Sequence, residues 1–151
     1  MSRFRFRLEP VLHMRQRAED QAQQGLARAE RQLQEAEQRL ALAEERLRLA
    51  YASANDAERG GTDVVHLTWH RNWIVVKTRD VEASRLDVRD RLETRDLRVQ
   101  QAQEARKQRR VLERFKDRAQ LLFDTGQAQR EMQAIDELAT MKAARRAGDF
   151  P

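Results

Sequence analysis

The sequence predicts an all-α protein: a long antiparallel two-helix coiled-coil hairpin with a C-terminal helical overhang, forming a single coiled-coil domain over residues 1–151. The chain is rich in charged residues (36%) and poor in aromatic ones (5%), with 5 Gly and 2 Pro, a composition typical of long helices. Leucine and alanine repeat in heptads through helix one, and one glycine pair interrupts the helical periodicity. Because aromatic and β-branched residues are too few to fill a thick core, we expect helices that pair along a narrow seam.

The first nine residues are expected to form a lead-in rather than a helix. Arginine alternates there with Phe4, Phe6 and Leu8, a period-2 pattern that is too short to make a sheet of its own. We expect an extended segment whose aromatic side chains pack on the neighbouring helix end. Pro10 suits the first helical turn, where its missing N–H has no hydrogen bond to lose.

Helix one is predicted over about residues 10–57. Its seam alternates spacings of four and three residues, with Leu at heptad position a and Ala at position d. The members of this ladder are Ala22, Leu26, Ala29, Leu33, Ala36, Leu40, Ala43, Leu47 and Ala50. An unbroken apolar seam of this kind requires a partner helix along its whole length.

A turn is predicted at about residues 58–63. Gly60 and Gly61 are consecutive, and Thr62 and Asp63, which both favour helix N-caps, follow them. We therefore expect the first helix to end here, the chain to reverse, and the second helix to begin directly afterwards.

Helix two is predicted over about residues 64–147. Its first apolar stripe comprises Ile74, Val81, Val88, Leu92, Val99 and Ala102. If the helices pair antiparallel, the numbers of partner residues add to a constant. The pairs Leu47–Ile74, Leu40–Val81, Leu33–Val88, Ala29–Leu92 and Ala22–Val99 all add to 121, and half of that falls within the glycine pair. The seam and the turn thus predict the same register.

Beyond Ala102 the apolar stripe is expected to slip by one residue, as at a stammer. The next stripe would comprise Ala105, Leu112, Phe115, Ala119 and Leu122. In the predicted register, helix one ends opposite about residue 113, so the rest of helix two is expected to project without an internal partner. Its exposed apolar residues, Leu121, Leu122, Phe123, Met132, Ile135, Leu138 and Met141, favour an external partner or a frayed end.

Charge and composition restrict the function. The net charge of +5 is carried mostly by arginine, which fits an acidic protein surface, nucleic acid or anionic lipid as a partner. There is no cysteine, no apolar run that could span a membrane, and no secretory signal at the start. No phosphate-binding loop, nucleophile elbow or carboxylate pair is recognisable, and paired helices offer no cavity for a reaction. We expect no enzyme activity, no cofactor and no metal site.

One histidine pair could in principle hold a metal ion. His66 and His70 are separated by four residues on the second helix, which places them on one face. The glutamate that follows the first histidine of a zinc-protease motif is missing, and no third ligand is evident. We interpret the pair as an incidental surface feature.

The opening Phe4-Arg5-Phe6-Arg7-Leu8-Glu9-Pro10-Val11-Leu12-His13-Met14-Arg15 resembles the start of the flagellar export protein family FliJ, which has the form F-x-F-x-L-x-x-V-L-x-x-R. The heptads, the central break and the chain length are similar too. The resemblance implies a cytoplasmic, non-enzymatic stalk of the flagellar type III export apparatus, peripheral at the inner face of the cell membrane. It implies three partners: the ring of the export ATPase FliI, whose assembly it promotes, the export gate protein FlhA, and export chaperones.

Two candidate binding surfaces follow from the residues and this resemblance. The ATPase-binding surface at the open end comprises Arg3, Phe4, Arg5, Phe6, Arg7, Arg106, Arg109, Arg110 and Arg114. The gate-binding surface near the turn comprises Leu47, Tyr51, Trp69, Trp73 and Val76. The alternative for the first is a solvated charged helix face, and for the second a cluster that caps the hairpin.

Other functions stay open at this point. An equivalent stalk of a virulence type III secretion system has a similar architecture. A basic coiled coil that binds nucleic acid is disfavoured, because acidic residues interleave with the basic ones and no base-reading motif is present. A generic dimer that pairs along the Leu/Ala seam is the remaining alternative.

Overall fold

The computed structural model describes residues 2–148. In that range the chain forms two long helices and no strand: α1 spans Glu9–Arg59 and α2 spans Val64–Gly148. The all-helical prediction is therefore confirmed. The chain divides into two compact units, one made of Ala18–Ala105 and the other of residues 1–17 with 106–151, and each is described by itself below.

Local chemistry explains where α1 begins and ends. Glu9 places a negative charge at the positive N-terminus of the helix dipole, and Arg59 places a positive charge in the last turn. After the helix, the Gly60 N–H donates to the Asp56 carbonyl (3.0 Å), and Gly61 adopts a φ of 71°. This left-handed conformation is strained for residues with a Cβ, so glycine at position 61 allows the chain to leave the helix.

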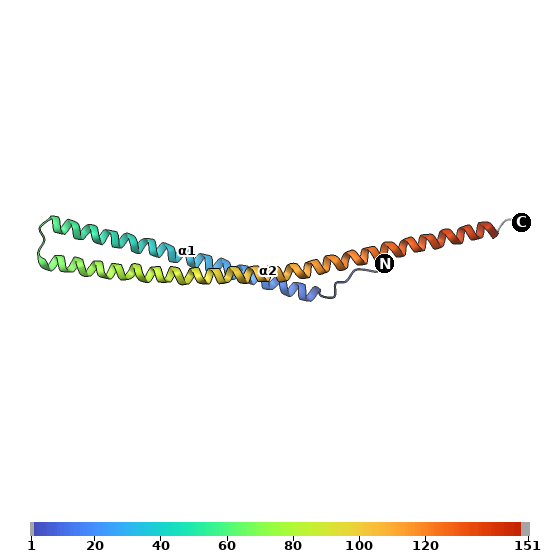
Figure 1. Cartoon of the computed structure of the whole chain (residues 1–151), viewed down its shortest axis with the longest axis horizontal. Helices are drawn as coiled ribbons and strands as arrows, with labels where there is room; N and C mark the ends of the chain where they lie inside the picture. Colours follow the sequence, from blue (N-terminus) through green and yellow to red (C-terminus); the bar gives the residue numbers. More distant parts are fainter. Residues whose placement is uncertain (1, 149–151) are drawn as a thin grey trace. The chain divides into compact units, whose positions relative to one another are not determined.

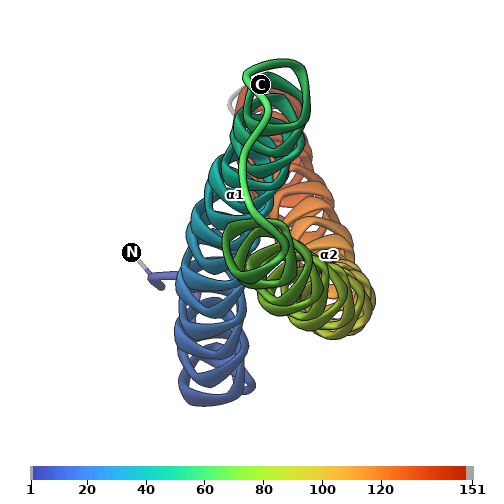
Figure 2. The same cartoon turned by 90° about the vertical axis from the view of Figure 1, so that its left-hand side faces the viewer.

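In the unit Ala18–Ala105, α1 and α2 lie side by side and are joined through the turn (Figures 1 and 2). The buried apolar side chains of α1 within this unit are all members of the predicted ladder: Ala29, Leu33, Ala36, Ala43 and Ala50. The ladder leucines Leu26, Leu40 and Leu47 are half-buried. The buried residues of α2 are Val81 and Ala102. The heptad pattern thus identified the covered face of α1 correctly.

Polar contacts between the helices show which segments are neighbours. Gln32 Oε1 accepts a hydrogen bond from Arg91 Nη1 (3.0 Å), and Arg39 Nη2 lies 3.0 Å from Asp87 Oδ2. Further towards the turn, Arg85 is 3.7 Å from Glu44. The residue numbers on α2 fall as those on α1 rise.

The register differs from the predicted one by two residues. Gln32 contacts Arg91, and the backbone of Gly25 lies against the Arg98 side chain. A Cβ atom at position 25 would lie 3.7 Å from Arg98 Nη1. A constant of 121 had placed residues 89 and 96 at these points. The turn extends through Thr62 and Asp63, so its centre lies further along the chain than the glycine pair.

The physical reason for this shift is that alanines face the larger residues. Ala50 borders a hollow with Trp73 and Lys77, on the turn of α2 that carries Ile74. Ala43 borders another with Asp80 and Ser84, on the turn of α2 that carries Val81. The predicted register had placed leucines there, but a small residue opposite a branched one lets the helices approach more closely.

One predicted member of the α2 stripe is wrong. Leu92 is 39% exposed, whereas its neighbours Arg91 and Arg95 are half-buried. The stems of the two arginines cover the seam while their charged ends reach solvent. Apolar character alone therefore misassigned the face of α2 at this point.

The predicted phase slip after Ala102 does not occur. Ala105, Leu112 and Ala119 are half-buried as expected, but Phe115 is 53% exposed and Leu122 is 70% exposed. The covered face instead continues with spacings of three and four through Arg109 and Lys116 to Phe123. These basic residues hid the continuation because the prediction followed apolar residues only.

The predicted overhang begins later than expected. The segment before α1, residues 2–8, lies along α2, and half-buried residues recur on α2 as far as Gln127. From residue 128 to residue 148 every side chain of α2 is exposed. The prediction counted helix one as the only cover and so placed the start of the overhang near residue 113.

Candidate protein-binding surfaces

The N-terminal strap, defined as residues 2–8, is held on α2 by contacts within one unit. The Phe4 and Phe123 rings lie 5.5 Å apart between centroids, at 55°. Gln127 Nε2 donates to the Ser2 hydroxyl (2.7 Å) and to the Ser2 carbonyl (3.1 Å). Phe4 and Phe6 are half-buried, and the expectation that the aromatic residues pack on the neighbouring helix is thereby confirmed for Phe4.

The alternation of the strap gives it two faces. Successive side chains of an extended segment point to opposite sides, so the arginines turn away when the phenylalanines face the helix. Arg3 and Arg5 are accordingly exposed, and Arg7, which lies in the turn that leads into α1, is exposed as well. Phe4, which was predicted to bind the ATPase, thus attaches the strap, Phe6 is half-buried, and the arginines are the residues available to a partner.

An open hollow of about 510 Å³ lies beside the strap and is bordered by charged and aromatic side chains. Among the residues that border it, Lys116 Nζ lies 3.0 Å from Glu9 Oε1 and 2.9 Å from Glu9 Oε2. This ion pair joins the first turn of α1 to α2. Arg3 and Arg5 border the same hollow, and neither forms an ion pair with another residue of the described range 2–148.

The predicted basic residues on α2 divide between two roles. Arg106, Arg110 and Arg114 are exposed. Arg109 differs, because its side chain is only 21% exposed and its Nη1 lies 2.6 Å from Glu113 Oε2. Arg109 therefore belongs to the seam, whereas the other three guanidinium groups form no ion pair with any residue from 2 to 148.

Near the turn, an aromatic face is formed by residues of α2. Trp69 and Trp73 stack with centroids 5.7 Å apart and planes 9° from parallel. Their exposure stays high, at 56% and 40%, and Val76, one further turn along, is exposed as well. Spacings of four and three put the three side chains on one side of α2, as the sequence suggested.

Lysine and leucine extend this aromatic face, and the sequence reading missed both. Lys77 Nζ lies 4.2 Å from the centroid of the Trp73 ring, a cation–π geometry. Leu49, Arg46 and Trp73 border one open hollow of about 290 Å³. The spacing of four between Trp73 and Lys77 was a signal that could have found the lysine, whereas Leu49 required the register.

The other two predicted gate-binding residues lie elsewhere. Leu47 is half-buried in the seam. Tyr51 follows buried Ala50 and Leu49 precedes it, so Tyr51 and Leu49 point about 200° apart around α1. Because Leu49 adjoins the aromatic face, the structure does not bring Tyr51 to that face.

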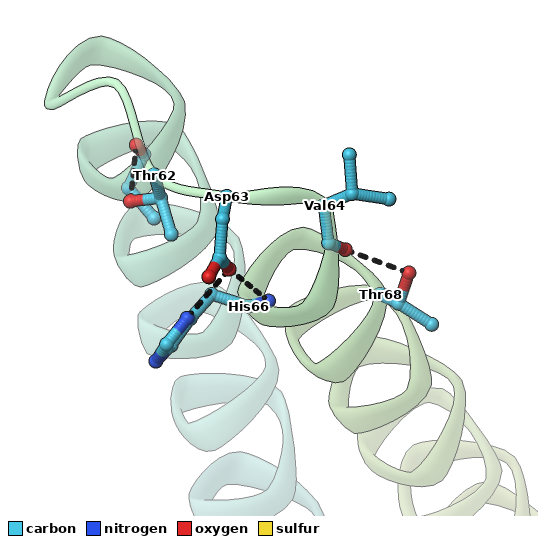
Figure 3. A network of polar contacts seen from close by, with 6 residues as sticks. Thr62, Asp63, Val64, His66 and Thr68 are labelled. Atoms are coloured by element: carbon cyan, nitrogen blue, oxygen red, sulfur yellow. Dashed lines mark hydrogen bonds and ion pairs between the residues drawn. The ribbon is translucent and has the colours of Figure 1, made fainter.

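The turn ends in a polar cap that involves His66, one member of the His66–His70 pair (Figure 3). Asp63 Oδ1 accepts from the His66 backbone N–H (2.9 Å) and lies 2.7 Å from His66 Nδ1. These bonds from His66 lower the pKa of the Asp63 carboxyl, with the backbone bond as the largest cause. Thr62 donates its hydroxyl to the Ala57 carbonyl (2.8 Å) across the turn.

His66 is therefore engaged in a helix cap. His70 Nδ1 is buried and has no hydrogen-bond partner in the described part of the chain. Within that part, no group of three histidine or acidic residues is arranged to hold a metal ion. Neither helix, over the residues described, has an apolar stretch long enough to cross a membrane.

Comparison with known proteins identifies the family. The model of the family described as "Flagellar FliJ protein" matches residues 4–148, nearly the whole chain. No curated protein and no solved structure gives a significant match. The matched region begins within the strap and includes both helices completely. The chain therefore belongs to the FliJ family, whose members are components of flagellar protein export.

Proposed function

We propose that this protein is a non-enzymatic coupling stalk of the flagellar type III export apparatus. It forms an antiparallel coiled coil that binds the FliI ATPase ring and promotes its assembly. It connects that ring to the export gate protein FlhA, acts at the inner face of the cell membrane and receives export chaperones. Family membership supports the flagellar setting, and the contacts between α1 and α2 support the coiled coil.

The exposed arginines beside the strap are the observation that carries the proposal. Arg5 and Arg7 on the strap, with Arg106, Arg110 and Arg114 on α2, are solvent-exposed and unpaired within residues 2–148. Free guanidinium groups can pair with successive carboxylates on an acidic surface with little loss of geometry. An ATPase ring with an acidic inner surface is the partner that this arrangement fits.

A pull-down with FliI tests this contact. The variant Arg106→Glu/Arg110→Glu/Arg114→Glu is expected to lower the affinity by about tenfold or more, because attraction is replaced by repulsion. The matched control, Arg28→Glu/Arg31→Glu/Arg79→Glu, changes the net charge equally on exposed residues of the other unit. Equal losses in the two variants would show that only net charge matters and would refute the assigned surface.

We assign the gate contact to the aromatic face of Trp69, Trp73 and Val76, with Leu49 at its edge. Exposed tryptophans that are already stacked lose little conformational freedom on binding, which suits them to anchor an interface. Leu47 supports this face from within the seam. The exposed position of Tyr51 on another side of α1 provides an internal control.

Binding to the cytoplasmic part of FlhA tests the assignment. Trp73→Ala is expected to weaken binding by about tenfold or more, as for the loss of a hot-spot residue, whereas Tyr51→Ala is expected to leave it unchanged. If Tyr51→Ala weakens binding as much as Trp73→Ala, the gate contacts a different side of the helix pair.

A further inference from the structure

A second face of α2 lies between residues 107 and 122, and it shares only Arg110 and Arg114 with the proposed ATPase contact. Successive residues of an α-helix are turned by about 100°. On that geometry, one arc of about 140° contains only basic and apolar side chains over this stretch. The basic members are Lys107, Arg110, Arg114 and Arg118, and the apolar members are Val111, Phe115, Leu121 and Leu122. We call this arc the basic–apolar face.

Solvent exposure and pairing distinguish this face from an ordinary charged helix surface. All four apolar side chains are exposed, from 44% at Val111 to 70% at Leu122. The four basic residues are exposed too, and none forms an ion pair within residues 2–148. The acidic residues of the same stretch, Glu113 and Asp117, fall outside the arc.

The basic–apolar face is turned away from the described segments that pack on α2 in this unit. Leu112, Ala119 and Phe123 mark the side of α2 that α1 and the strap cover. By helix geometry, this covered side points away from the basic–apolar face. A flat surface can therefore approach Phe115 and Leu122 without meeting α1 or the strap.

We propose that the basic–apolar face binds an anionic phospholipid surface. Such a surface attracts each nearby Lys or Arg by about fivefold in affinity and accepts exposed apolar side chains between its headgroups. Val111, Phe115 and Leu122 supply the apolar contact, and the basic residues flank them on one side. The protein thereby adds its own contact with lipid to those made through its protein partners.

A membrane surface fits this face better than a partner helix. Val111, Phe115 and Leu122 have coiled-coil spacing only if Arg118 occupies the seam between them. A close-packed partner helix would desolvate that guanidinium group, whereas lipid headgroups let arginine extend along the apolar layer and keep its charge in water. An open hollow of about 180 Å³ between Val111, Arg114, Phe115 and Arg118 leaves room for such movement.

Vesicle flotation of the full chain alone tests the proposal. Wild type is expected to float with vesicles that contain equal amounts of phosphatidylcholine and phosphatidylglycerol, and to dissociate from them in high salt. It is expected not to bind vesicles of phosphatidylcholine alone. The variant Lys107→Glu/Arg118→Glu, which spares the residues assigned to the ATPase, is expected to bind at least about tenfold more weakly. Phe115→Ser, which keeps the charge, is expected to reduce binding severalfold.

The matched control is Arg28→Glu/Arg79→Glu, which changes the net charge equally on the other unit. Circular dichroism of each variant verifies that the helices are retained. Absence of flotation by wild type, or equal losses in control and variant, would overturn the lipid contact. FliI binding by the same variants is measured in parallel, so failure of the lipid proposal is distinguishable from failure of the ATPase contact.

Discussion

At the scale of single residues, the small side chains of α1 decide how the two helices fit. Ala43 and Ala50 are buried, and each borders a turn of α2 that carries a branched residue, Val81 or Ile74. An interior position that is filled to normal density has no room for three additional carbon atoms. The alanines of the ladder are therefore a packing requirement and not only helix-forming residues.

Enlarging one of these alanines tests that requirement. Ala50→Leu is expected to lower the free energy of unfolding by about 1–3 kcal/mol, because the helices must move apart or adopt strained rotamers. Ala41→Leu, on an exposed position of the same helix, is expected to change it by less than about 0.5 kcal/mol. Urea denaturation followed by circular dichroism measures both. Similar losses for the two variants would contradict the seam.

Asp63 is the second residue whose role is specific. Its carboxylate caps α2, and the bonds from His66 lower its pKa. The charged cap therefore makes its full contribution to stability above the pKa of an unfolded aspartate. As the pH falls through the lowered value, the carboxyl protonates and its contribution to stability is lost.

A pH titration by NMR verifies this direction. The amide proton of His66 is expected to shift with an apparent pKa below that of an unperturbed aspartate, about 3.9. In Asp63→Asn, which can still cap the helix without a charge, this titration is expected to disappear. A midpoint above the unperturbed value would mean that the carboxylate is not stabilised in the fold.

At the scale of elements, the strap continues to cover α2 beyond the N-terminus of α1. Its hold depends on Phe4 against Phe123, on the hydrogen bonds from Gln127 to Ser2, and on the pair between Lys116 and Glu9. An aromatic pair of this type contributes about 0.5–1.5 kcal/mol beyond the area it buries. A short segment attached in this way opens more readily than the paired helices.

Limited trypsin digestion reports on strap opening. Phe4→Ala is expected to speed cleavage after Arg5 and Arg7 severalfold, since the open state becomes more populated. Phe115→Ala removes an exposed ring from α2, the helix that carries Phe123, and is expected to leave the cleavage rate unchanged. Equal cleavage of wild type and Phe4→Ala would show that the ring contact does not hold the strap.

The elements also show how far sequence reasoning extends. The Leu/Ala ladder and the glycine pair predicted both helices and the covered face of α1, because a strict heptad has one interpretation. The register was beyond reach, since it depends on which alanine meets which branched residue. Phe115 and Leu122 were assigned to the wrong face because Arg109 and Lys116 occupy the seam, and the pattern of apolar residues alone does not reveal this.

The candidate surfaces were predictable to different degrees. The alternation of the strap and the spacing of Trp69 and Trp73 identified residues that the structure does group. Tyr51 was included because it is near the turn in sequence, but proximity along a helix does not place two side chains on one face. Arg109 resembles its basic neighbours in the sequence, but it differs from them in being half-buried in the seam and in its ion pair with Glu113.

At the scale of the whole molecule, the chain combines surfaces of different chemistry on two continuous helices. Exposed arginines of the strap and α2 suit an acidic partner, and the stacked tryptophans suit an apolar anchor site. The two surfaces belong to different compact units, so each can be altered without touching the contacts of the other. A coupling protein needs this independence in order to hold two partners at once.

A three-component capture assay tests the coupling most directly. Immobilised FlhA cytoplasmic domain is expected to retain FliI only when this protein is present. Trp73→Ala and Arg106→Glu/Arg110→Glu/Arg114→Glu are each expected to abolish that bridging while keeping the binary contact with the other partner. Contradiction of the account would come from undiminished bridging by either variant, or from loss of both binary contacts through a change at one surface.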